Sequence, residues 1–140
     1  MRGRRKNEGF TLIELLLVVV IIGILAAIVV PRLAGRSEEA RISKAKGDLA
    51  TFRTALGAYE VDNGKYPSTE QGLVALLQKP VTAPEPKNWK GPYIEGNEIP
   101  PDPWGNDYVY LNPGERNLQG YDLYSWGPDG QPNTEDDIER

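Results

Sequence analysis

The residues able to carry out chemistry in this 140-residue chain are carboxylates, lysines and tyrosines, because histidine and cysteine are absent. Without those two residue types the chain cannot build a serine or cysteine triad, a zinc site of nitrogen and sulfur ligands, a haem or iron–sulfur centre, or a redox dithiol. The missing cysteines also mean that any cross-link in this small protein is non-covalent. A metal ion held by oxygen ligands is the obvious substitute for a disulfide.

Acidic residues gather in the C-terminal stretch 126–137, which reads WGPDGQPNTEDD. Ca²⁺ takes about six to eight oxygen ligands from carboxylates and carbonyls on a loop that can wrap it. The stretch is not an EF-hand because, counting from Asp129, Thr134 stands where glycine is required and Arg140 stands where a bidentate glutamate belongs. An acidic tail is usually only solvated. From the residues alone, a solvated tail and a calcium loop both remain open.

Aromatic residues and aspartates in the segment 102–106 and on two later aromatic stretches allow two interpretations. They could form a carbohydrate platform with a pair of catalytic carboxylates, as in a glycosidase. Core packing is the better account, because a domain of roughly 110 residues has few other large side chains with which to build its interior.

The N-terminal part of the chain differs sharply from the rest. Residues 1–9 carry four basic residues and one acidic residue, a net charge of +3, so the remainder carries −7 of the chain's total of −4. This acidic body argues against nucleic acid as a partner. Residues 10–30 form an apolar run of 21 residues in which Glu14 is the only charge. As a helix the run is about 31 Å long, enough to cross the hydrocarbon core of a bilayer.

A cleaved secretory signal and a plain signal anchor are the simpler interpretations of this run. The apolar core of a secretory signal has only about 7–15 residues and ends at a small-residue cleavage site, whereas here the run continues past Ala26 and Ala27. Basic residues stand on both sides of the run, so charge alone leaves the topology open.

The junction Gly9-Phe10-Thr11-Leu12-Ile13-Glu14, with its basic leader, resembles the class 3 signal of type IV prepilins. The resemblance implies that a prepilin peptidase of the inner membrane cuts between Gly9 and Phe10 on the cytoplasmic side and methylates the new amine of Phe10. The apolar helix is then kept, with the leader cytoplasmic and the acidic domain outside.

Glu14 needs compensation, because a carboxylate inside the hydrocarbon costs about 2.5–3.5 kcal/mol. An interfacial position near the end of the span is one explanation. The resemblance implies another, in which Glu14 pairs with the freed amine of Phe10 on a neighbouring subunit during assembly.

An amphipathic pattern follows the apolar run. The two together predict one long helix from about Thr11 to Val61. The apolar positions of the second half are Ile42, Ala45, Leu49, Phe52, Leu56 and Tyr59. Pro31 removes one helical hydrogen bond and predicts a modest kink, with Gly23 as a second weak point. The resemblance implies that helix between Gly23 and Pro31 melts when subunits pack into a filament.

Shorter elements follow the turn signal Asp62-Asn63-Gly64. Ser68 or Thr69 is expected to cap a short helix with a leucine-rich buried face. Residues 78–103 are rich in proline and predict a loop, anchored by Trp89 and by Tyr93-Ile94. Two aromatic, alternating strands are expected at 107–111 and 121–126, joined through Asn112-Pro113-Gly114. The expected fold class is α+β, a long N-terminal helix packed on a small antiparallel sheet.

Further motifs narrow the resemblance to the major pseudopilins of the type II secretion system, within the type IV pilin-like superfamily. These motifs are Tyr66-Pro67 with Thr69-Glu70-Gln71-Gly72-Leu73, Asp102-Pro103-Trp104-Gly105, and Ser125-x-Gly127-x-Asp129-Gly130. The family binds calcium in its C-terminal loop. The resemblance implies six ligand residues here: the side chains of Asp129, Asp136, Asp137 and Thr134, and the carbonyls of Trp126 and Gln131. Asp102 lies outside this loop, so its loss is expected to leave calcium dependence intact.

The resemblance implies a non-enzymatic subunit with three segments: a cleaved leader (1–9), a transmembrane assembly helix (10–30) and a periplasmic domain (31–140). It implies a homopolymeric pseudopilus that helps to drive folded proteins through the outer-membrane secretin. The implied partners are the prepilin peptidase, minor pseudopilins, the inner-membrane assembly platform and the inner membrane. Two alternatives stay open: a type IV pilin of a surface fibre, and a monomeric membrane-anchored domain that binds calcium or hydrolyses with carboxylates.

Overall fold

The fold is taken from a computed structural model, which describes residues 9–139 apart from the side chains of residues 29–35. The longest element is the helix α1, Leu12–Asn63, which confirms the expected helix to within two residues at each end. It is unbroken across Gly23 and Pro31. It ends where Gly64 adopts a φ of 74°, a left-handed conformation that glycine tolerates best, and the Gly64 N–H still donates to the carbonyl of Glu60 at 2.7 Å.

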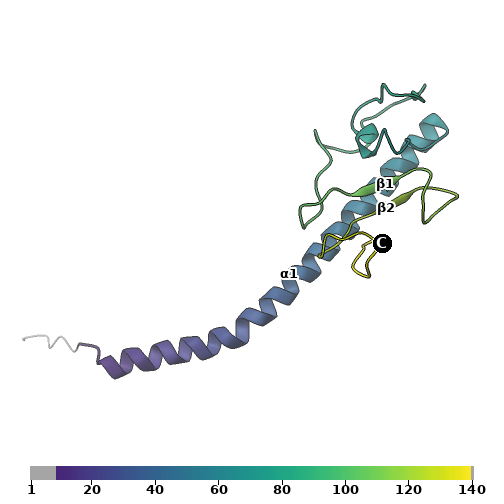
Figure 1. The fold of residues 1–140 in the computed structure, drawn as a ribbon. Coiled ribbons are helices and arrows are strands. Elements are labelled where there is room, and N and C mark those ends of the chain that lie inside the picture. Colours follow the sequence, from purple (N-terminus) through teal and green to yellow (C-terminus); the bar gives the residue numbers. More distant parts are fainter. Residues whose placement is uncertain (1–8, 140) are drawn as a thin grey trace, which may run out of the picture. The chain divides into compact units, whose positions relative to one another are not determined.

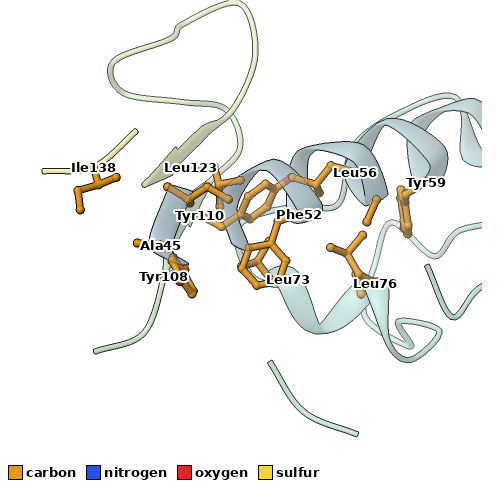
Figure 2. Close-up of a cluster of buried hydrophobic side chains, with 13 residues drawn as sticks. Ala45, Phe52, Leu56, Tyr59, Leu73, Leu76, Tyr108, Tyr110, Leu123 and Ile138 are labelled. Carbon is orange, nitrogen blue, oxygen red and sulfur yellow. The ribbon is translucent and has the colours of Figure 1, made fainter. Parts of the chain in front are cut away.

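The chain divides into two compact units, Met1–Glu39 and Ala40–Arg140, and the hydrophobic core belongs to the second. One face of α1 supplies the core at the predicted helical spacing. Its buried side chains are Ala45, Leu49, Phe52, Ala55, Leu56 and Tyr59, and Ile42 is partly buried. Figure 2 shows the labelled helix residues Ala45, Phe52, Leu56 and Tyr59 together with Leu73, Leu76, Tyr108 and Tyr110 from the rest of the domain. The ring of Phe52 meets that of Tyr108 edge-on at 5.2 Å. The aromatic residues therefore build the interior, as expected.

The segment after α1 forms a turn and a short 3₁₀ helix, η1, Leu73–Leu76. Ser68 and Gln71 bond reciprocally: the Ser68 N–H donates to Gln71 Oε1 at 3.0 Å, and the Gln71 N–H donates to Ser68 Oγ at 3.2 Å. Gly72 follows with a φ of 60°, a conformation outside the right-handed helix. Ser68 therefore caps this turn and not the helix, and η1 is shorter than predicted because it begins only after Gly72.

The residues 78–103 contain no helix or strand, as predicted, and Trp89 anchors them. Its indole Nε1 donates to the carbonyl of Ala75 at 2.9 Å, and its ring meets that of Tyr93 edge-on at 5.8 Å. Tyr93 in turn packs against the core residue Tyr59.

Two antiparallel strands complete the domain: β1, Val109–Leu111, and β2, Asp122–Tyr124, paired with Tyr110 opposite Leu123. Figure 1 shows them beside the second half of α1. Both strands are shorter than predicted. β1 begins after Tyr108, whose hydroxyl donates to Asp48 of α1 at 2.8 Å. β2 ends before Ser125, which pairs with Ile138 instead of with β1. A long helix with a small antiparallel sheet is thus confirmed as the architecture.

Candidate functional site

The N-terminal motif lies at the start of α1, and its side chains are exposed. Thr11 precedes the helix and caps it: its Oγ1 accepts from the N–H of Glu14 at 3.3 Å, and its carbonyl accepts from the N–H of Leu15 at 3.2 Å. Gly9 and Phe10 lie outside the helix and both are exposed, so the bond between them is accessible. The leader residues 1–8 and the side chain of Pro31 lie outside the described residues.

The apolar run leaves its side chains without partners in this chain. All fourteen large hydrophobic side chains between Phe10 and Ile28 are between 47% and 80% exposed. Within the residues described with their side chains, no helical segment is both long enough and apolar enough to cross a membrane.

The C-terminal loop is closed at its base by a two-residue bridge. Ser125 and Ile138 exchange backbone hydrogen bonds of 3.0 and 2.9 Å, so residues 126–137 form a loop between them. Ser125 is fully buried, and its hydroxyl donates to Asp102 Oδ2 at 2.6 Å while accepting from the N–H of Gly127 at 3.0 Å. Asp102 is therefore bonded to the base of the loop, although it lies outside the loop in the sequence.

The ligand residues implied by the resemblance all lie on this loop, but they are only partly gathered. Asp129 Oδ1 accepts from the N–H of Gln131 at 2.9 Å, and the hydroxyl of Thr134 lies 3.4 Å from the carbonyl oxygen of Gln131. Asp136 is exposed, and Trp126 is half-buried. Across residues 9–139, with the gap at 29–35, no three acidic side chains form a group that could hold a metal ion.

Asp137 is the best candidate ligand, because its two oxygens have different surroundings. The side chain is only 6% exposed; Oδ2 accepts from the guanidinium of Arg116 and from the N–H of Asn133 at 3.1 Å, whereas Oδ1 is buried with no hydrogen-bond partner. A buried carboxylate oxygen without a donor is suited to a cation. Carboxylates, a hydroxyl and carbonyls are also the ligands that Ca²⁺ prefers, so these residues fit a calcium ion in their chemistry.

Comparison with known proteins covers both parts of the chain. Residues 4–30 match the family described as the prokaryotic N-terminal methylation motif, and residues 32–140 match that of type II secretion system protein G. The chain belongs to the type II secretion system protein G family. It is accordingly a major pseudopilin of this system, which is a structural subunit and not an enzyme.

Individual proteins similar to this pseudopilin have the same description. The type II secretion system core protein G of Pseudomonas aeruginosa is 51% identical over 134 residues, covering 95% of this chain and 92% of that protein. The core protein G of Escherichia coli K12 is 50% identical over 139 residues, covering 99% and 93%. The crystal structure of the major pseudopilin of enterohaemorrhagic E. coli matches with a TM-score of 0.65 at 48% identity, covering 76% of this chain and 87% of that one.

Two residues of this pseudopilin have no signal in the sequence: Arg116, which contacts the C-terminal loop, and Asp122, which binds the backbone at Arg116. Arg116 contacts the loop from the long connection between β1 and β2, and its pKa is raised above its ordinary value, chiefly by the bond to Asp137. Asp122 accepts three backbone hydrogen bonds from the same connection. Burial alone would raise the pKa of Asp122, but these three donors and the nearby Arg116 charge lower it below its ordinary value.

Asp102 did carry a signal that could be recognised. An aspartate before Pro and Gly is typical of a turn in which the side chain bonds to the backbone two to four residues later. Here Asp102 Oδ1 accepts from the N–H groups of Trp104 and Asn106 at 3.0 and 2.8 Å.

Proposed function

We propose that this major pseudopilin is processed between Gly9 and Phe10 and then polymerises through residues 10–30 into a periplasmic pseudopilus. The pseudopilus drives folded proteins through the outer-membrane secretin. In this scheme a prepilin peptidase removes the leader and methylates the amine of Phe10. The accessible bond between Gly9 and Phe10, which lies outside α1, supports processing at this position.

The observation that carries the proposal is the exposure of the apolar run. Burying a side chain of the size of valine, leucine or phenylalanine stabilises by about 1.5–3 kcal/mol, and here fourteen of them between Phe10 and Ile28 remain uncovered within one chain. Soluble monomers rarely leave contiguous apolar patches larger than a few hundred Å² exposed. Lipid before assembly and neighbouring subunits after assembly are the two environments that would cover this surface.

Location and partners follow from the same scheme. The subunit waits in the inner membrane as a single-pass protein with its C-terminal domain in the periplasm. It then joins copies of itself and minor pseudopilins on the inner-membrane assembly platform, and the filament acts towards the secretin.

Glu14 provides the test of assembly as distinct from insertion. Its side chain is exposed at the start of α1, where a carboxylate in the membrane is unfavourable until the amine of Phe10 of a neighbouring subunit pairs with it. Glu14→Leu should therefore insert into the membrane at least as well as the wild type but polymerise poorly. Ile24→Leu, in the same apolar run, is the matched control.

The experiment expresses each variant in a host with a type II secretion system that lacks its own protein G. It measures membrane-inserted protein, filament yield and secretion of a folded cargo. Normal filaments from Glu14→Leu would contradict the pairing. A wild type found only as membrane-anchored monomers, with no filaments, would contradict polymerisation altogether.

We also propose that Ca²⁺ binds the C-terminal loop. The side chains of Asp129, Thr134, Asp136 and Asp137 and the carbonyls of Trp126 and Gln131 would hold it. The ion would supply positive charge that neutralises the carboxylates of the loop. The unpartnered Oδ1 of Asp137 and the oxygen-rich donor set support this proposal.

A further inference from the structure

The connection between β1 and β2, residues 112–121, carries Arg116, and the buried Asp122 fixes its backbone. The carboxylate of Asp122 accepts from the N–H groups of Glu115, Arg116 and Asn117 at 2.7, 2.7 and 2.8 Å. Asp122 is only 5% exposed. Three charge-assisted bonds to consecutive N–H groups hold the backbone firmly at this position. The starting point of the Arg116 side chain is therefore set by the fold.

The guanidinium of Arg116 is held by the surroundings as well. It lies over the ring of Tyr124, 4.0 Å from the ring centroid. From there it donates to Asp137 and Glu139 through ion pairs and to Asn133 Oδ1 at 2.9 Å. All three partners belong to the C-terminal segment 133–139. The planar fork of arginine allows such simultaneous contacts, whereas a lysine ammonium is a single point of charge.

The C-terminal segment is strongly acidic, and the only basic side chain that lines its hollow in the described part of the chain is Lys46 of α1. Glu135, Asp136, Asp137 and Glu139 all fall within five positions, and all four border a hollow of about 330 Å³. Like charges at this spacing repel one another. Two of these four carboxylates are bound by Arg116.

We propose that Arg116 is a resident cation that fastens the acidic C-terminal segment to the β1–β2 connection without any metal, and that it competes with calcium for the charge of Asp137. We call the contacts of Arg116 with Asn133, Asp137 and Glu139 the Arg116 latch. The latch stands on these contacts alone, whereas the competition rests on the calcium site proposed above.

The direction of the competition follows from charge. Removing Arg116 has two opposite effects on calcium binding. Asp137 is no longer held in one orientation, which weakens the binding of Ca²⁺. A positive charge next to the same carboxylate is also lost, and this loss strengthens the binding of Ca²⁺. A divalent ion responds twice as strongly to that charge as a monovalent one. Asn133 still donates to Asp137 Oδ2 and keeps much of the orientation. The charge effect therefore exceeds the orientation effect.

The test compares Arg116→Gln and Arg116→Lys with the wild type and with Lys79→Gln, which removes one exposed positive charge elsewhere. Thermal unfolding of the full chain in detergent micelles is followed by tryptophan fluorescence in excess chelator. Ca²⁺ affinity is measured by titration calorimetry at low temperature, where every variant is folded.

In chelator, Arg116→Gln should unfold about 5–10 °C below the wild type, because a buried carboxylate loses its partner. Arg116→Lys should unfold at a temperature between those of Arg116→Gln and the wild type, since lysine keeps the positive charge but not the planar fork of the guanidinium. Arg116→Gln should also bind Ca²⁺ roughly 2- to 10-fold more tightly than the wild type, and Lys79→Gln should match the wild type in both measurements.

Two results would overturn the inference separately. If Arg116→Gln and Lys79→Gln unfold at the same temperature in chelator, there is no latch. If Arg116→Gln binds Ca²⁺ equally or more weakly, there is no competition. A wild type that binds no Ca²⁺ overturns both the calcium site and the competition, and the chelator measurements still decide the latch.

Discussion

Replacing the buried Asp122 should destabilise the domain much more than replacing an exposed aspartate. Its carboxylate accepts three backbone N–H groups at 2.7–2.8 Å and is 5% exposed. Hydrogen bonds to a charged group contribute about 1.5–3 kcal/mol each. The donors Glu115, Arg116 and Asn117 are themselves in an exposed connection, so water replaces part of each bond. We therefore expect Asp122→Ala to cost about 3–5 kcal/mol and Asp122→Asn about half of that, because one amide oxygen remains.

The assay is urea unfolding of the full chain in detergent, followed by tryptophan fluorescence and far-ultraviolet circular dichroism. Asp107→Asn and Asp107→Ala are the matched controls, because Asp107 is an exposed aspartate just before β1. Their effect should stay within about 0.5 kcal/mol. If Asp122→Ala loses no more stability than Asp107→Ala, the carboxylate does not organise the connection that carries Arg116.

Two further predictions concern pH and calcium. The pKa of Asp122 is lowered in the folded state, so the contribution of its carboxylate to stability is fully present above the ordinary pKa of 3.8 and is lost as the pH falls through the folded pKa. Asp122→Asn should therefore lose less stability than the wild type on acidification. Identical stability profiles of the two proteins at acid pH would contradict this. Ca²⁺ at a hundredfold excess over its Kd should stabilise the wild type by about 2.7 kcal/mol, or very roughly 10–20 °C in Tm. Asp129→Ala should lose much of that shift and Mg²⁺ should not reproduce it, whereas unfolding that is the same with Ca²⁺ and with chelator would reject the site.

The sequence predicts local features of the fold well, because they rest on local patterns. The spacing of Leu49, Phe52, Leu56 and Tyr59 is enough to identify the buried face of α1, and all four are 3% exposed or less. The proline-rich loop and its anchor Trp89 follow from composition in the same way. The N-terminal motif is contiguous, so its family is evident from the residues themselves.

Long-range contacts are where sequence reasoning stops. Ile138 is a single apolar residue in an acidic tail, and nothing near it in sequence indicates that it pairs with Ser125. Arg116 stands 21 residues before Asp137 in an irregular connection, so no periodicity links them. The link from Asp102 through the Ser125 hydroxyl to Gly127 likewise depends on tertiary packing. The loop's carboxylates are predictable, but the groups that position them are not.

The N-terminal residue of the mature protein tests the central claim most directly. The measurement is the mass of the N-terminal peptide of protein purified from a host with a prepilin peptidase. We predict that the wild type begins with N-methylated Phe10, and that Gly9→Leu, which places bulk beside the cleaved bond, remains a full-length precursor in the inner membrane. A mature wild-type protein that begins at Met1, or after Ala27, would contradict processing and assembly as a pseudopilin.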